Sequence, residues 1–134
     1  MIPLLLARLH NIFAGSEALR YVTLPAGAAL TVLTGGAAYT WGVWAQLAAS
    51  IGAADMWFCG IHMANPSLAV DYEVDIGIGA GGAETTRVQV DFSTGYLQLA
   101  YPVRLPAASR LAGRCRDATG AGTCAVKAQL ITGV

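Results

Sequence analysis

This sequence has little charge of either sign. Only 12% of its 134 residues are Asp, Glu, Lys or Arg, against about a quarter in an ordinary soluble domain. Eight basic residues balance eight acidic ones, so the basic surplus that nucleic acids and anionic membranes attract is absent. The mean hydropathy of +0.54 favours a surface covered by neighbouring subunits, although Ala and Gly raise the hydropathy without making patches.

Long apolar runs are also missing. None approaches the ~20 residues of a membrane helix, and the apolar start lacks the early positive charges and long apolar core of a secretion signal. The length fits a single domain, and we expect an N-terminal arm over residues 1–14 and a β-domain over residues 15–134. In the arm, Leu5, Leu9 and Phe13 recur at a spacing of four, so this stripe either packs under its own domain or docks on another molecule.

Catalytic and cofactor motifs are lacking as well. The chain contains no G-x-S-x-G, H-E-x-x-H, P-loop or C-x-x-C, and His10 and His62 have no cysteine or carboxylate at metal-ligand spacing. Gly77, Gly79 and Gly82 match G-x-G-x-x-G, but strand-like residues follow them where a nucleotide site needs a helix. We therefore expect a glycine turn here, and no enzyme activity, cofactor or metal.

What the chain does have is alternation of apolar and polar residues. From Asp71 to Ile76, three carboxylates alternate with Tyr, Val and Ile, the period-two pattern of a strand with one face on a core. Similar segments recur between turns rich in Gly, Pro, Ser and Thr, which predicts an all-β fold, an antiparallel β-sandwich. The expected strands cover residues 21–24, 30–33, 41–48, 56–63, 70–78, 85–92, 97–105, 110–116 and 124–131.

Two of these segments are apolar on both faces. They are Trp41 to Trp44 and Met56 to Met63, and a strand that is apolar on both sides is covered on both sides. One cover is the core, and the other is the N-terminal arm or a second subunit. We therefore expect Trp44 and Phe58 at an interface.

Asp71, Glu73 and Asp75 form an acidic stripe on one strand face. Three readings stay open: ion pairs with arginines on the same sheet or across a subunit boundary, plain solvation, or a contribution to a Ca²⁺ site completed by a loop. The candidate partners are Arg104, Arg110, Arg114 and Arg116. Of these we place Arg104 and Arg110 at the expected interface.

The chain has three cysteines. Cys115 and Cys124 flank a turn, and a hairpin in simple register would set them opposite each other, within reach of a disulfide. A reducing cytoplasm would disfavour that bond, so the disulfide and the free thiols both stay open. Cys59 is expected to be a buried apolar residue.

Two longer elements carry a family resemblance. Residues 74–84 read VDIGIGAGGAE and residues 101–114 read YPVRLPAASRLAGR, and with the aromatic Trp41 to Trp44 segment they resemble small virion proteins of tailed bacteriophages. The likeness covers roughly residues 38–131. Ala108 stands where the family pattern favours Gly, so the turn is expected to avoid a positive φ there.

The resemblance implies a jelly-roll sandwich of about eight strands that serves as a head decoration, neck or tail component. It also implies a virion protein, assembled in the host cytoplasm, whose partners are itself, as a trimer or other closed homo-oligomer, and other virion proteins. A carbohydrate- or receptor-binding module of a phage tail is the alternative, with Trp41, Trp44, Trp57 or Tyr96 as a platform. An enzyme built on the strand carboxylates is disfavoured, because solvent-facing carboxylates have no reason for a raised pKa.

Overall fold

The computed structural model describes residues 20–92 and 95–132, which form an all-β structure. Its strands are β1 (Arg20–Leu24), β2 (Leu30–Leu33), β3 (Ala45–Ala48), β4 (Met56–Ala64), β5 (Tyr72–Ile78), β6 (Thr85–Phe92), β7 (Gly95–Leu105), β8 (Leu111–Asp117) and β9 (Thr123–Thr132). Each segment that the alternation predicted holds a strand, although the third begins at Ala45 rather than at Trp41. No helix in the described part of the chain has the length and apolar character needed to cross a membrane.

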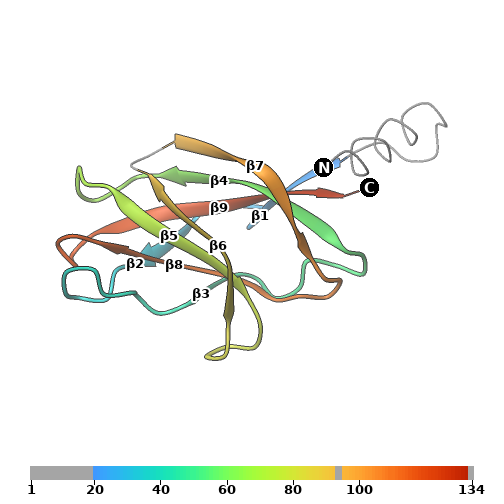
Figure 1. The fold of residues 1–134 in the computed structure, drawn as a ribbon, viewed down its shortest axis with the longest axis horizontal. Helices are drawn as coiled ribbons and strands as arrows, with labels where there is room; N and C mark the ends of the chain where they lie inside the picture. The colour runs from blue at the N-terminus through green and yellow to red at the C-terminus, as the bar shows by residue number, and fades with distance from the viewer. Residues whose placement is uncertain (1–19, 93–94, 133–134) are drawn as a thin grey trace.

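The strands form two antiparallel sheets that face each other as a β-sandwich (Figure 1). Sheet A has the order β1-β9-β4-β7, with β2 also paired to β9, and sheet B has the order β3-β8-β5-β6. β1 and β2 pair with successive halves of β9 and so share one edge position. The eight positions that result, β2-β9-β4-β7 facing β3-β8-β5-β6, have the strand order of a jelly roll, which confirms the expected fold.

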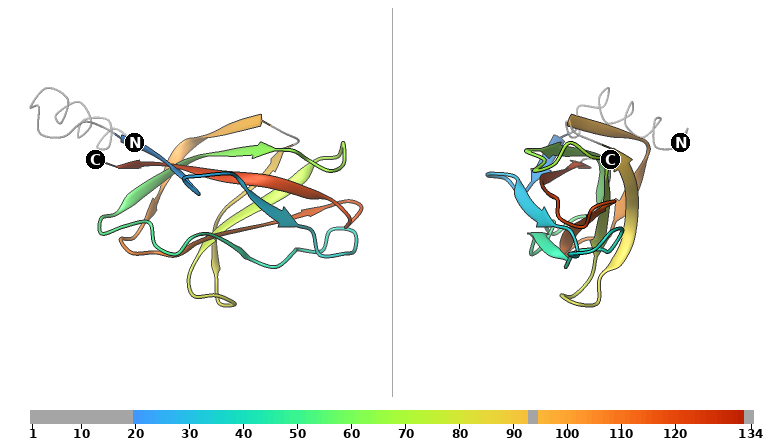
Figure 2. Two further views of the ribbon diagram at one scale, coloured as in Figure 1. Left: turned by 180° about the vertical axis from the view of Figure 1, so that it is seen from behind. Right: turned by 90° about the vertical axis from the view of Figure 1, so that its left-hand side faces the viewer.

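Most connections cross from one sheet to the other. In the end-on view of Figure 2, the blue β2 and the yellow β6 lie on opposite sides of the molecule, at opposite edges of the two layers.

The ends of the described chain meet, because Arg20 at the start of β1 pairs with Thr132 at the end of β9. The first and last described residues therefore lie side by side at one end of sheet A.

The core lies between the sheets. Sheet B contributes Tyr72, Val74 and Ile76, which are fully buried as their alternation predicted. From sheet A, Phe58 packs into the same core with no exposed surface. The expectation that Phe58 forms an interface was therefore wrong, because its ring is buried in the chain's own core.

The strands that carry Cys115 and Cys124 do not form the expected hairpin. β8 belongs to sheet B and β9 to sheet A, so the intervening turn crosses the sandwich, and the two cysteines meet inside the core. Both are buried free thiols. A hydrogen bond with Cys124 lowers the pKa of Cys115, while the same hydrogen bond together with burial raises the pKa of Cys124.

Two turns test what the sequence predicted about backbone conformation, one rich in glycine and one with alanine in place of glycine. The β5–β6 connection is a glycine turn, with Gly79 at φ 134° and Gly82 at φ 84°, as the sequence predicted. At Ala108, between β7 and β8, φ is 61°, so the expectation of a negative φ there was wrong. The turn is held by the Ala108 amide, which donates to the Gly52 carbonyl at 2.7 Å. Ala108 therefore adopts the left-handed backbone conformation although it has a Cβ atom.

Candidate functional site

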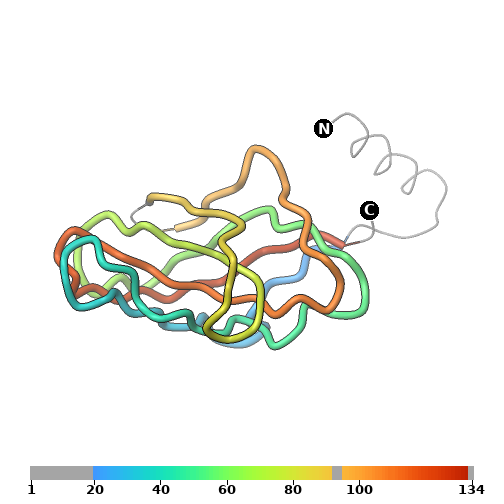
Figure 3. Tube along the Cα trace, turned by 60° about the horizontal axis from the view of Figure 1, so that its bottom comes forward, coloured from blue at the N-terminus to red at the C-terminus, as the bar shows by residue number. Residues whose placement is uncertain are grey.

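The most irregular feature of sheet A is an arch in β7. On β7, Gln98 pairs with Gly60 and Val103 pairs with Phe58, so the four residues Leu99–Pro102 stand opposite the single residue Cys59. The chain between those two pairs must leave the plane of the sheet, and the orange tube rises away from its neighbours in Figure 3. We call residues Leu99–Pro102 the β7 arch. It is an enlarged bulge, and bulges re-aim side chains.

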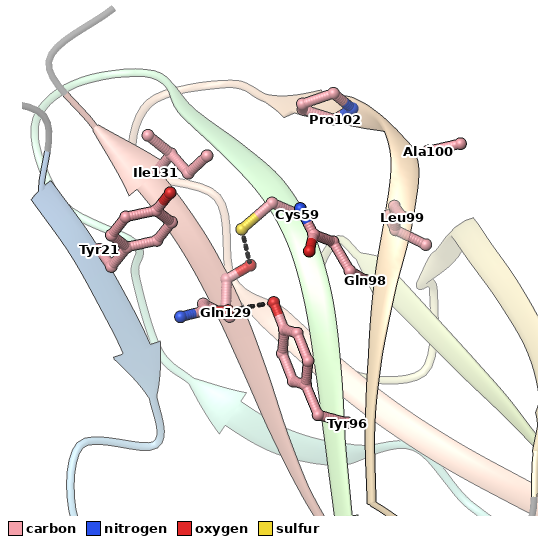
Figure 4. Close-up of a pocket in the computed structure, with 9 residues that line it drawn as sticks. All are labelled: Tyr21, Cys59, Tyr96, Gln98, Leu99, Ala100, Pro102, Gln129 and Ile131. Atoms are coloured by element: carbon pink, nitrogen blue, oxygen red, sulfur yellow. Dashed lines mark hydrogen bonds between the residues drawn. The ribbon is translucent and has the colours of Figure 1, made fainter.

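The arch opens a hollow on the outer face of sheet A, with a volume of about 300 Å³. We call it the tyrosine groove. Figure 4 shows Tyr21 of β1 and Tyr96 of β7 on either side of Gln129 of β9. The full lining is Tyr21, Cys59, Tyr96, Gln98, Leu99, Ala100, Pro102, Gln129 and Ile131, and none of these nine described side chains is charged.

The wall of the groove is held by hydrogen bonds within the chain. The Tyr96 hydroxyl donates to the Gln129 amide oxygen, and the Cys59 thiol donates to the Gln129 backbone carbonyl at 3.3 Å. Burial raises the pKa of Tyr96, with smaller contributions from Cys59 and Tyr21. The Tyr96 hydroxyl therefore keeps its proton at neutral pH and donates it in a hydrogen bond to Gln129.

Tyr96 keeps its place because β4 has a glycine beneath it. A Cβ atom added at Gly60 would collide with the end of the Tyr96 ring. The outer side of β4 is thus covered at this point by a side chain from β7. From the sequence we expected the N-terminal arm or another subunit to cover this face of β4. At Gly60 the covering group is instead the Tyr96 side chain from the same sheet.

The outer face of sheet B is built differently. The guanidinium carbon of Arg114 lies 4.2 Å from the ring centre of Trp44 and 4.9 Å from that of Trp41, and the guanidinium carbon of Arg116 lies 4.5 Å from the Trp41 ring. We call these four side chains the arginine–tryptophan ladder. Such cation–π contacts stabilise by about 0.5–2 kcal/mol each. Because arginines already lie over the rings of Trp41 and Trp44, these rings make a poor open platform for sugar.

The ladder is anchored by the acidic stripe. Arg114 Nη2 lies 2.8 Å from Asp75 Oδ2, and Arg116 pairs with Glu73. Thr86 adds a hydrogen bond to the same Asp75 oxygen at 2.9 Å. The ion-pair reading of the stripe is therefore confirmed at Glu73 and Asp75, with partners on the neighbouring strand of the same sheet.

Unlike Glu73 and Asp75, Asp71 has no arginine partner among the described residues. It lines a second hollow of about 340 Å³ together with Glu73, Asp91 and Arg116. Across residues 20–92 and 95–132, no group of three or more His, Cys, Asp or Glu side chains is placed to hold a metal ion. The hollow is thus a polar depression beside the ladder.

The remaining predicted interface residues fall in three places. Arg104 pairs with Asp55 at 2.5 Å on the surface, and Arg110 pairs with Glu84 at 2.6 Å, so both arginines have partners inside the chain. Trp44 is half-buried within the ladder. Leu5, Leu9 and Phe13 lie outside the described residues.

The groove itself was not predicted, although one signal pointed to it. We expected a continuous strand over residues 97–105, but Pro102 lies in its interior, and proline has no N–H to donate to a ladder. Proline inside a strand marks an edge or a bulge. From the sequence alone, Tyr96 is only one candidate member of an aromatic platform, and nothing in the sequence places Gln98 and Gln129 beside it.

Comparisons with known proteins give one structural likeness. No protein-family model matches the chain, and no curated protein matches it. Among solved structures, it is similar to the CBM36-1 domain of a multidomain xylanase from the hindgut metagenome of Trinervitermes trinervoides, with 11% identity and a TM-score of 0.41, over 87% of this chain and 98% of that one. That likeness concerns the β-sandwich fold alone.

Proposed function

We propose that this chain is a non-enzymatic structural protein of a tailed-bacteriophage virion that self-associates and attaches to a larger protein lattice. Two things support the proposal beside the jelly-roll fold. The motifs that resemble the phage proteins form the β5–β6 and β7–β8 turns, which fix the shape of the sandwich. The surface chemistry also suits assembly.

The observation that carries the proposal is how the few charges are used. Arg104, Arg110, Arg114 and Arg116 each pair with a carboxylate of the same chain. Such pairing neutralises half of the eight basic and half of the eight acidic residues of the sequence. Little uncompensated charge is left to oppose contact with another protein.

Several large apolar side chains are also exposed. Tyr39, Val43 and Tyr101 are each at least 60% exposed. Tyrosine and tryptophan are enriched, and most charged residues depleted, at the centres of protein interfaces. A surface with exposed aromatics and paired charges is therefore suited to a closed homo-oligomer, such as a trimer, within the virion.

The N-terminal arm supplies the attachment in this proposal. Its apolar stripe of Leu5, Leu9 and Phe13 precedes β1, and β1 starts at the end of sheet A where β9 finishes. An arm that docks on another molecule would be joined to the sandwich at that end of sheet A. Its partner in the proposal is another virion protein of the capsid, neck or tail.

The test is the solution mass of the full chain by light scattering, with and without residues 1–14. We expect a closed oligomer that survives removal of the arm, because the sandwich faces build it. A monodisperse monomer in both samples at high protein concentration would overturn the self-association. Mass spectrometry of purified virions from the phage that encodes the chain tests the location separately, and absence from the virion would overturn that part.

A further inference from the structure

We propose that the tyrosine groove is a binding site for a neutral sugar ring. This activity goes beyond the structural role and does not depend on it, because a subunit can bind sugar in any assembly state that leaves the groove open. The proposal rests on the groove's size, its chemistry and the way its wall is fixed.

The size suits a small ligand. The groove has a volume of about 300 Å³, at the lower end of the range of roughly 300–1,000 Å³ for small-molecule sites. It is hollowed beneath the β7 arch, which gives one side of the ligand a wall of backbone and apolar side chains from Leu99, Ala100 and Pro102. One or two sugar rings match this volume better than an extended polymer does.

The chemistry of the lining matches a polyhydroxylated ring. Tyr21 and Tyr96 combine an apolar ring face with a hydroxyl group, and they are 60% and 50% exposed. Aromatic faces of this kind contact the C–H side of a sugar. Gln98 and Gln129 supply amides that both donate and accept hydrogen bonds, as sugar hydroxyls require.

The absence of charged residues from the described lining of the groove disfavours ionic ligands. None of the nine described lining residues carries a charge, so a carboxylate or ammonium group would lose hydration without gaining a counter-charge. We therefore expect neutral hexoses to bind and uronic or sialic acids to be rejected. The same polar lining disfavours an apolar side chain of a second copy, which would cover the amides without hydrogen bonding to them.

The wall is arranged before any ligand arrives. The hydrogen bond from Tyr96 to Gln129 and the contact of the Tyr96 ring with Gly60 hold the ring in place. A preorganised site loses less conformational freedom on binding. The groove is thus a built feature, rather than two tyrosines that happen to lie near each other.

The experiment uses the full chain and saturation-transfer NMR, with titration of each hit. The probes are neutral disaccharides built from glucose, galactose, mannose or N-acetylglucosamine, with glucuronic acid and N-acetylneuraminic acid as charged comparisons. We expect at least one neutral sugar to bind and the charged ones to give no transfer. If no neutral sugar binds, or if the acids bind as tightly as the neutral sugars, the proposal is overturned.

Four variants locate the binding. Tyr21→Ala and Tyr96→Ala are each expected to weaken it about tenfold, because each removes a stacking face. Gly60→Ala leaves every lining residue unchanged but displaces the Tyr96 ring, and it is expected to weaken binding similarly. Tyr101→Ala is the matched control, since Tyr101 lies on the arch, is 68% exposed and does not line the groove.

The outcomes separate this proposal from the assembly role. Equal weakening by Tyr101→Ala and Tyr21→Ala would show that sugar contacts the arch non-specifically, and would overturn the site. A change in solution mass of the Tyr21→Ala variant with unchanged sugar binding would make the groove a subunit contact, and would overturn it too. If Tyr96→Ala unfolds the protein, Tyr21→Ala and Gly60→Ala still decide the question.

Discussion

The two outer faces of the sandwich use their polar residues in opposite ways. On sheet B, Arg114 and Arg116 are fixed between carboxylates and tryptophan rings, so polar and aromatic groups satisfy one another. On sheet A, the tyrosine groove presents hydroxyls and amides in a hollow free of charged side chains among its nine described lining residues. One face is closed by its own ion pairs, whereas the other keeps an open hollow lined by uncharged residues.

This difference comes from backbone geometry as well as composition. β5 and β8 pair without interruption from Tyr72 to Ile78, so the charges of Glu73 and Asp75 fall directly beside arginines. β7 and β4 lose register at the arch, and a bulged strand leaves side chains without a cross-strand partner. A regular sheet face thus pairs its charged groups along the strands, whereas the interrupted face forms a hollow whose only described polar pairing is between uncharged groups.

The largest effect that would sharpen the comparison is expected from Arg114→Ala. Asp75 is only 1% exposed, and its Oδ1 has no hydrogen-bond partner in the described structure. Removing Arg114 leaves this carboxylate buried without a counter-charge, which costs about 3 kcal/mol of unfolding free energy. Denaturant unfolding of the variant and the parent measures the loss.

Arg104→Ala is the matched control for Arg114→Ala. It removes an ion pair of similar length to Asp55, but the side chains of Arg104 and Asp55 are 56% and 43% exposed. Exposed pairs contribute less than about 1 kcal/mol, so this variant is expected to unfold nearly like the parent. Equal losses in the two variants would contradict the view that sheet B is closed by buried charge.

The next effect concerns pH. Burial alone would raise the pKa of Asp117, but hydrogen bonds from Thr119, Gly120 and Gly122 outweigh it and hold the pKa below the ordinary value. A carboxylate whose folded pKa lies below its unfolded value of about 3.9 stabilises the fold above that pH and loses this contribution as pH falls through the folded value. We expect the unfolding free energy to fall in acid, and Asp117→Asn to flatten that fall.

The groove offers the contrasting pH behaviour. It has no carboxylate or histidine among its described lining residues, and the pKa of Tyr96 lies above its ordinary value. Sugar binding should therefore stay constant from neutral to mildly acidic pH while the protein remains folded, as titrations at several pH values would show. A steep pH dependence of binding would mean that a titrating group takes part in the site. It would contradict the view that the groove, unlike sheet B, works without charge.

The sequence predicted the local structure well and the long-range connections poorly. Alternation located the strands and the inward side chains Tyr72, Val74 and Ile76, because it follows directly from strand geometry. It also suggested arginine partners for Glu73 and Asp75. It did not show that β8 and β9 belong to different sheets, since a short turn between two strands looks alike in a hairpin and in a crossing.

The groove was beyond sequence reasoning for a related reason. Its lining comes from β1, β4, β7 and β9, and the register between these strands decides which side chains meet. Pro102 signalled an irregularity in β7, but the size of the arch depends on where pairing resumes at Val103. Only the folded arrangement places Tyr21 beside Gln129 and Tyr96.

The smallest effect is expected in the loop that connects sheet A to sheet B, at Ala108. Its φ of 61° costs a non-glycine residue about 1–2 kcal/mol, while glycine adds about 0.5–1 kcal/mol of entropy loss on folding. Ala108→Gly should therefore raise the unfolding free energy slightly, by up to about 1 kcal/mol. Ala107→Gly, one residue earlier, has no positive φ to relieve and keeps its backbone hydrogen bond to Asp55, so it should lower stability by about 0.4–1 kcal/mol. Denaturant unfolding of the two variants should give changes in unfolding free energy of opposite sign. Changes of the same sign would mean that the turn does not hold Ala108 in the left-handed conformation. The loop that joins sheet A to sheet B would then be less tightly fixed than this φ implies.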